Sequence, residues 1–134
     1  MSLIPGRATI SLTTETNQIV DDLCVRFPLT ERMDAAKVGV AFAIRSSLTP
    51  SAQDRASGSG TGTTWNVGSF DNDGQLRELV RALNPSTSDD LYVLLEALMN
   101  RGLLALRDLL ATRSASSLTE LLELAAALPT QGSD

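Results

Sequence analysis

The chain has 134 residues, of which 43% are hydrophobic and only 4% aromatic, and its formal charge is −5. This length fits one domain, or one small domain with an appended helical segment. An acidic chain is a poor generic ligand for nucleic acid or anionic membrane, because both require Lys and Arg. With no histidine and a single cysteine, the sequence excludes Ser-His-Asp and Cys-His catalysis, an intrachain disulfide, and imidazole or all-thiolate zinc sites. We therefore expect a non-enzymatic protein without a metal or other cofactor.

The N-terminal residues and the longest apolar stretches indicate where in the cell the protein is expected. The first ten residues, MSLIPGRATI, lack the basic start and apolar run of a signal peptide. No apolar stretch approaches the length of a membrane-spanning helix. We expect a cytoplasmic protein without a membrane partner.

The segment RATISLT, residues 7–13, alternates between polar and apolar side chains. This period of two is typical of a half-buried strand. The apolar face would carry Ala8, Ile10 and Leu12. The polar face would carry Arg7, Thr9, Ser11 and Thr13.

The period then changes to that of a helix. Thr13 or Thr14 can cap its start, and Glu15 would lie near its positive end. Apolar side chains recur at helical spacing, and Pro28 ends the helix. The members of this apolar stripe are Ile19, Val20, Leu23, Cys24 and Phe27. The lone Cys24 is best explained as a small core side chain.

A second helix is predicted from about Thr30–Asp34 to Ser47. Its middle, VGVAFAI at residues 38–44, is apolar on every side and must be buried all round. One short strand and one amphipathic helix cannot surround it, so a partner chain or the C-terminal half of this chain is needed. The small side chains of Gly39, Ala41 and Ala43 would let another backbone approach closely.

The next segment, residues 49–64, is rich in Ser, Gly and Thr and predicts a flexible loop. Its G-x-G-x-G run has neither the βαβ context of a dinucleotide site nor the Lys of a P-loop. TTWNVGSF, residues 63–70, predicts a short strand or an extended segment with Trp65 as a core or interface anchor.

DNDG, residues 71–74, resembles part of an EF-hand loop but lacks the bidentate Glu. We interpret it as a turn and helix cap, with Asn72 and Gln75 at capping-box spacing.

The C-terminal half predicts helices throughout. One helix spans about Gln75–Leu83, and another opens after the acidic segment 86–90. Gly102 either ends that helix or lies inside a longer one. Ser117 and Glu120 form a capping box before a last helix over residues 118–128, and residues 130–134 predict a disordered tail.

Residues 7–48 thus follow the order strand, helix, helix: RATISLT, then ETNQIVDDLCVRF, then DAAKVGVAFAIRSSL. In order, lengths and pattern this part resembles the ribbon-helix-helix DNA-binding proteins, and it is faintly similar to accessory proteins of DNA phosphorothioation systems. FPLTER replaces the usual Gly-rich turn, and Arg7 is the only basic residue on the strand. The resemblance implies a homodimer in which N-terminal strands pair between chains and the partner chain buries the second helix.

The resemblance also implies site residues. Outward side chains of the strand would enter the DNA major groove, and the start of the second helix would lie near phosphates. The implied DNA contacts are Arg7, Thr9, Ser11, Thr30 and Arg32. The implied oligomer-interface residues are Ile10, Leu12, Val38, Val40, Phe42 and Ile44.

The expected architecture is mainly α, with a short N-terminal strand and about five helices. It divides into a ribbon-helix-helix-like dimerisation segment (1–48), the loop (49–64), a helical segment (65–129) and the tail (130–134). One candidate function is a DNA-associated or regulatory homo-oligomer, which accounts for the fully apolar second helix. The alternative is a helical protein-interaction module or subunit of a larger complex without DNA contact. Residues 1–50 carry five basic and five acidic side chains, so the charge of −5 lies in the remainder.

Overall fold

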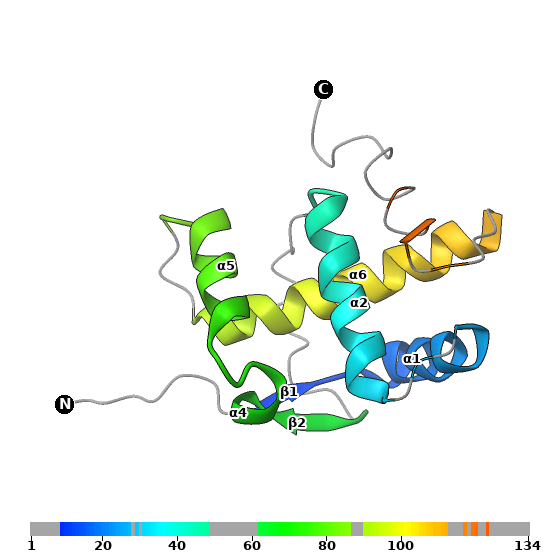
Figure 1. The fold of residues 1–134 in the computed structure, drawn as a ribbon, viewed down its shortest axis with the longest axis horizontal. Helices are drawn as coiled ribbons and strands as arrows, with labels where there is room; N and C mark the ends of the chain where they lie inside the picture. The colour runs from blue at the N-terminus through cyan, green and yellow to red at the C-terminus, as the bar shows by residue number, and fades with distance from the viewer. Residues whose placement is uncertain are drawn as a thin grey trace.

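A computed structural model describes residues 9–27, 29, 31–48, 62–86, 90–112, 117, 119, 120 and 123. The predicted loop before Gly62, the tail, Arg7 and Thr30 lie outside these residues. The described part is mainly helical, as predicted, with five helices and one small sheet (Figure 1). In chain order the elements are β1 (Thr9–Ser11), α1 (Thr14–Arg26), α2 (Arg32–Arg45), β2 (Thr64–Asn66), α4 (Val67–Phe70), α5 (Gln75–Leu83) and α6 (Leu91–Thr112).

The sheet forms within the chain. β1 pairs antiparallel with β2, and Ile10 lies opposite Trp65. Two further backbone hydrogen bonds extend the pairing, from Leu12 N to Thr63 O and from Gly62 N to Leu12 O, each 2.9 Å long. The strand that the resemblance assigns to pairing between chains therefore has its partner within the same chain. The partner includes residues 62–64, the end of the predicted loop, so the loop prediction is wrong for these three residues. Trp65 is half-buried and packs on Phe70 with 5.5 Å between ring centroids.

α1 begins where the sequence predicts. Thr13 is its N-cap: the Thr13 hydroxyl accepts a hydrogen bond from Thr16 N at 3.1 Å, and Thr13 N donates to Thr16 Oγ1 at 2.9 Å. This reciprocal capping box fixes the direction in which α1 leaves β1.

α2 crosses α6 at two glycines (Figure 1). A Cβ atom on Gly102 would lie 1.9 Å from Gly39 O, and one on Gly39 would lie 2.6 Å from Leu103 Cγ. The two backbones thus touch where neither residue has a side chain, as the small residues of α2 predict. Gly102 lies inside a single 22-residue helix, which settles the alternative that the sequence left open.

The apolar middle of α2 is buried by this crossing and by α1. Among the predicted interface residues, Ile10, Leu12 and Phe42 are 0% exposed and Val40 is 2% exposed. Val38 and Ile44 are half-buried against the same core. No second chain is needed to bury these side chains, because the C-terminal half supplies the cover. Residues on both sides of the predicted loop share one core.

The cap of α5 differs from the prediction. Asp71, which is 6% exposed, accepts hydrogen bonds from Leu76 N at 2.9 Å and from Arg77 N at 3.1 Å. Gly74, with φ of 73°, turns the chain so that the first helical amides face this carboxylate. The predicted capping box of Asn72 and Gln75 is therefore wrong, but the prediction of a turn and helix cap in residues 71–74 is confirmed: Asp71 caps the helix together with Asp73, whose Oδ1 accepts a hydrogen bond from Gln75 N at 3.1 Å. Tyr92 Oη on α6 donates to the Asp71 carboxylate at 3.0 Å.

Candidate functional site

The predicted DNA contacts that the structure describes are engaged within the chain. Ser11 is 8% exposed, and its hydroxyl forms a 2.8 Å hydrogen bond with Thr64 Oγ1. Arg32 forms an ion pair with Asp21, and its Nε donates to Thr63 Oγ1 at 3.2 Å. Thr9 is half-buried in β1. Ser11 and Arg32 thus bind the side chains of Thr64 and Thr63, at the start of β2. A base-reading surface instead needs polar groups that face solvent.

The edge of β1 that faces away from β2 is covered by α6. Ser11 N donates to Glu96 Oε2 at 2.7 Å, and Asn100 Nδ2 donates to Ser11 O at 3.2 Å. Thr16 Oγ1 also donates to Asn100 Oδ1, at 2.6 Å. Glu96 and Asn100 are one turn apart on α6 and take the place of a neighbouring strand. A strand from a second chain cannot pair with the Ser11 backbone while these bonds exist.

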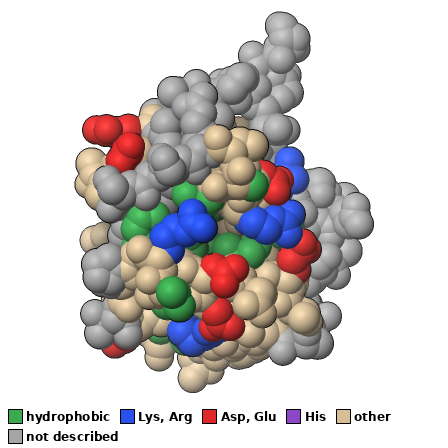
Figure 2. All heavy atoms as spheres, turned by 90° about the vertical axis from the view of Figure 1, so that its right-hand side faces the viewer, with side chains coloured by type: hydrophobic (Ala, Val, Ile, Leu, Met, Phe, Trp, Pro, Cys, Tyr) green, Lys and Arg blue, Asp and Glu red, His purple; other side chains and the backbone are tan. Residues whose placement is uncertain are grey.

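An open groove lies where α1 and α6 run side by side. It has a volume of about 230 Å³. Its lining residues are Ile19, Asp22, Leu23 and Arg26 from α1 and Arg107, Leu110 and Ala111 from α6. Figure 2, which views the right-hand side of Figure 1, shows hydrophobic side chains between Lys and Arg side chains, with Asp and Glu beside them. The groove is smaller than the ~300–1,000 Å³ typical of small-molecule pockets, which favours insertion of a few side chains of a partner.

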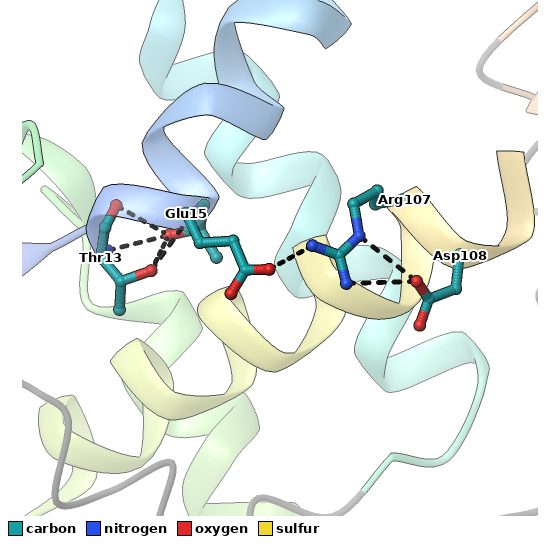
Figure 3. A network of polar contacts seen from close by, with 5 residues as sticks. Thr13, Glu15, Arg107 and Asp108 are labelled. Carbon is teal, nitrogen blue, oxygen red and sulfur yellow. Dashed lines mark hydrogen bonds and ion pairs between the residues drawn. The ribbon is translucent and has the colours of Figure 1, made fainter. Parts of the chain in front are cut away.

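One end of the groove is held by an ion-pair network at the start of α1. Glu15, in the first turn of α1, pairs with Arg107, which also contacts Asp108 Oδ1 at 3.3 Å (Figure 3). The hydrogen bond with Glu15 raises the pKa of Arg107, so this guanidinium stays charged. The Thr13–Thr16 cap sets the position of Glu15, and the network joins the two walls of the groove.

The other end of the groove carries Arg26, whose chain neighbour Val25 does not line the groove. Arg26 is exposed and makes no ion pair with any residue that the structure describes. Val25 is 89% exposed, the most exposed of the large hydrophobic side chains described. An apolar floor next to an unpaired guanidinium suits an apolar segment that also carries a carboxylate.

Only part of this groove was predictable from the sequence. Ile19 and Leu23 belong to the predicted apolar stripe of α1, but nothing local indicates that this part of the stripe lies beside an open groove. Arg26, Arg107, Leu110 and Ala111 were missed, because only the pairing of α1 with the end of α6 brings them together. The i, i+4 spacing of Glu96 and Asn100 in the apolar run LYVLLEALMN was the available signal for the covered edge of β1.

No cluster of three or more Cys, Asp or Glu side chains suited to a metal is found among the described residues. None of the described helices has the length and apolar character needed to cross a membrane. No protein-family model matches the sequence, and comparisons with curated proteins and with solved structures find no match.

Proposed function

We propose that the protein is a non-enzymatic interaction module that binds an amphipathic helix of a partner protein in the α1–α6 groove. The observation that carries the proposal is an apolar floor open to solvent, with the unpaired guanidinium of Arg26 at its rim. The partner helix would insert apolar side chains into the groove and place a carboxylate opposite Arg26.

The dimensions of the groove favour a helix as the ligand. Ile19 and Arg26 are seven residues apart on α1, a distance of about 11 Å along the helix axis. This length matches the i, i+3, i+4 and i+7 anchors by which amphipathic helices dock in grooves. Arg107 is already paired with Glu15 and Asp108, so Arg26 is the cation at this groove that a partner carboxylate would meet.

DNA association is the competing prediction, and the described contacts favour it less. Ser11 and Arg32 would each have to give up bonds within the chain to reach DNA. Breaking such bonds costs free energy, and the few phosphate contacts that an acidic chain can make would have to offset this cost.

A site-specific photo-crosslinker at Asp22, an exposed residue that lines the groove, tests the proposal with the full chain in the native host cell. The same crosslinker at Leu83, which is 51% exposed on α5, is the control position. We expect a cross-linked protein from Asp22 and not from Leu83, also when nuclease and high salt are applied before irradiation. Mass spectrometry of the adduct should identify an amphipathic segment with an acidic residue.

Binding of that segment as a synthetic peptide to the purified full chain then tests the rim charge. Arg26→Glu should weaken binding about three- to tenfold, because it removes a favourable charge and adds a repulsive one. Ala111→Glu, at an exposed position in the groove, should weaken binding at least as much. Arg81→Glu on α5 is the matched control and should have no effect.

Three results would contradict the proposal: cross-linking from Leu83 alone, complete loss of the complex on nuclease treatment, or binding insensitive to Arg26→Glu and Ala111→Glu. A low-salt gel shift of wild type, lost when Arg7, Thr9 and Ser11 are all changed to Ala, would instead support the DNA-associated function.

A further inference from the structure

The two walls of the α1–α6 groove run in the same direction. Thr16, in the first turn of α1, contacts Asn100 of α6, and the groove beyond this contact is lined from residues 19–26 of α1 and 107–111 of α6. Residue numbers therefore rise in the same sense along both walls, and both helices run toward the right of Figure 1. α1 ends at Arg26, and α6 ends one residue past its groove segment. The C-terminal ends of the two helices thus lie at the same end of the groove.

Two parallel walls give the groove an electrostatic direction. Each helix carries a partial negative charge at its C-terminus, where the last carbonyl groups have no partner within the helix. This end of the groove therefore favours the positive N-terminus of a third helix. A helix that lies antiparallel to both walls places its N-terminus there, whereas a parallel helix would add a third negative end beside the other two.

The charges on the α1 wall are a second, independent observation. Asp22 and Arg26 are both exposed and line the groove. The side chain of neither one forms an ion pair or a hydrogen bond with any residue that the structure describes. They are one turn apart, about 6 Å along α1, with Arg26 nearer the C-terminal end of the groove. The third charged residue of the lining, Arg107, is already paired with Glu15 and Asp108.

An antiparallel helix matches this order of charges when an acidic residue precedes a basic residue by four positions. The acidic residue, in the first turn of that helix, would meet Arg26, and the basic residue, one turn later, would meet Asp22. Acidic side chains are favoured in the first turn of a helix, and Glu four residues before Lys is the more favourable order within a helix. A parallel helix would need the reverse order, which is the less favourable one.

We propose that the partner helix binds antiparallel to α1 and α6, with an acidic residue in its first turn opposite Arg26 and a basic residue four positions later opposite Asp22. This orientation rests on the proposed function, in which the groove binds a helix. The apolar side chains of Ile19 and Leu23 supply contact area for either direction of the helix, and the two charges select one direction.

Selection from a peptide display library tests the orientation while the natural partner is unidentified. The library holds helical peptides with fixed apolar anchors at i, i+3, i+4 and i+7 and random residues elsewhere, and the immobilised full chain is the target. Wild type should select an acidic residue four positions before a basic residue. The double variant Asp22→Arg with Arg26→Asp should select the reverse order, because it exchanges the two charges of the wall. Glu78→Arg with Arg81→Glu exchanges an exposed ion pair on α5 and is the matched control, which should select the wild-type order.

A selected peptide then reports affinity and direction. Exchanging its acidic and basic residues should weaken binding to wild type about three- to tenfold at low salt and less at high salt. The same exchange should strengthen binding to the double variant. With a nitroxide coupled to the N-terminal amine of the peptide, we expect stronger broadening of the Arg26 amide than of the Glu15 amide in the ¹⁵N-labelled chain. A nitroxide at the C-terminus of the peptide should give the opposite ratio.

The possible outcomes separate the orientation from the proposed function. Three results would overturn the orientation and leave the groove as a helix site: peptides that lose binding on Ala111→Glu but show no order of charges, the same order selected by wild type and the double variant, or N-terminal nitroxide broadening that is stronger at Glu15 than at Arg26. A library that yields no peptide sensitive to Ala111→Glu would contradict the proposed function itself, and the orientation with it.

Discussion

α6 packs on α2 and on α1 in two different ways, and the difference lies in the side chains at each contact. At the α2 crossing, Gly39 and Gly102 bring the backbones together, and the residues around them are fully buried. Beside α1, bulky and charged side chains keep the helices apart, and apolar surface stays open between them. The first contact completes the core within one chain, and the second leaves a surface that a partner can use.

The glycine crossing should be the most sensitive point of the molecule. Gly102→Ala would place a methyl group 1.9 Å from a backbone carbonyl oxygen, and a backbone cannot move aside as a flexible side chain does. We expect a loss of at least about 3 kcal/mol in the free energy of unfolding, measured by denaturant titration. Gly68→Ala is the control, because a Cβ there meets nothing within 4 Å. If Gly102→Ala and Gly68→Ala were equally stable, close packing at the glycine crossing would not be what holds α2 on α6.

We expect the second-largest effect on stability at the covered edge of β1. Asn100→Ala removes the acceptor of the Thr16 hydroxyl and the donor to Ser11 O in a buried site. Because it leaves both groups without this partner, we expect a loss of about 2 kcal/mol in the free energy of unfolding. Hydrogen exchange of the β1 and β2 amides should accelerate along with it. Unchanged exchange in the sheet would show that α6 does not hold this edge.

The contact between Tyr92 of α6 and Asp71, which precedes α5, predicts that stability depends on pH. Burial, followed by the hydrogen bond to Asp71, raises the pKa of Tyr92. The folded chain therefore keeps the phenol proton to higher pH than the unfolded chain does, so this contribution to stability is lost as pH rises above about 10. Tyr92 is the only tyrosine, so its absorbance reports the titration directly.

Asp71→Asn should lower the pKa of Tyr92 toward its ordinary value, because it removes the negative charge beside the phenol. It should also cost about 1 kcal/mol of stability, since the α5 cap loses its charged acceptor. A Tyr92 titration that is the same in wild type and Asp71→Asn would contradict the contact.

The walls of the α1–α6 groove should contribute least to stability. Arg107→Ala removes a solvent-exposed ion pair with Glu15, and such pairs contribute little to stability because water screens them. We expect the smallest change in the free energy of unfolding among these variants, and a still smaller one at high salt. A loss comparable to that of Gly102→Ala would mean that the groove is part of the folding core and not a surface kept for binding.

Much of the helical content was predictable from local pattern. The range Gln75–Leu83 for α5 and the Thr13 cap of α1 are confirmed, because both follow from apolar spacing and capping chemistry close in sequence. The small residues of α2 correctly indicated a close backbone contact. Local pattern could not show that α6 is the helix that contacts α2 at this point. Gly102 is equally compatible with a helix end and a helix interior.

Pairing over long sequence distances accounts for what the sequence analysis missed. For residues 63–70 the sequence predicted a short strand or an extended segment, and pairing with β1 makes Thr64–Asn66 the strand, whereas Val67–Phe70 forms the helix α4. The α5 cap lies within residues 71–74 as predicted, but Gly74 turns the helix start so that its first amides bond Asp71 and Asp73 and not Asn72. The candidate groove needs Arg26 and Arg107 from helices separated by most of the chain, and no local period brings those two residues together.

The concentration dependence of thermal unfolding tests the central claim most directly. A core completed within one chain unfolds at a Tm that does not depend on protein concentration, whereas a core shared between chains gains stability by mass action. We expect the wild-type Tm to stay constant over about a hundredfold range of concentration. A Tm that rises steadily with concentration would contradict the account, and would return Ile10, Leu12, Val40 and Phe42 to an interface between chains.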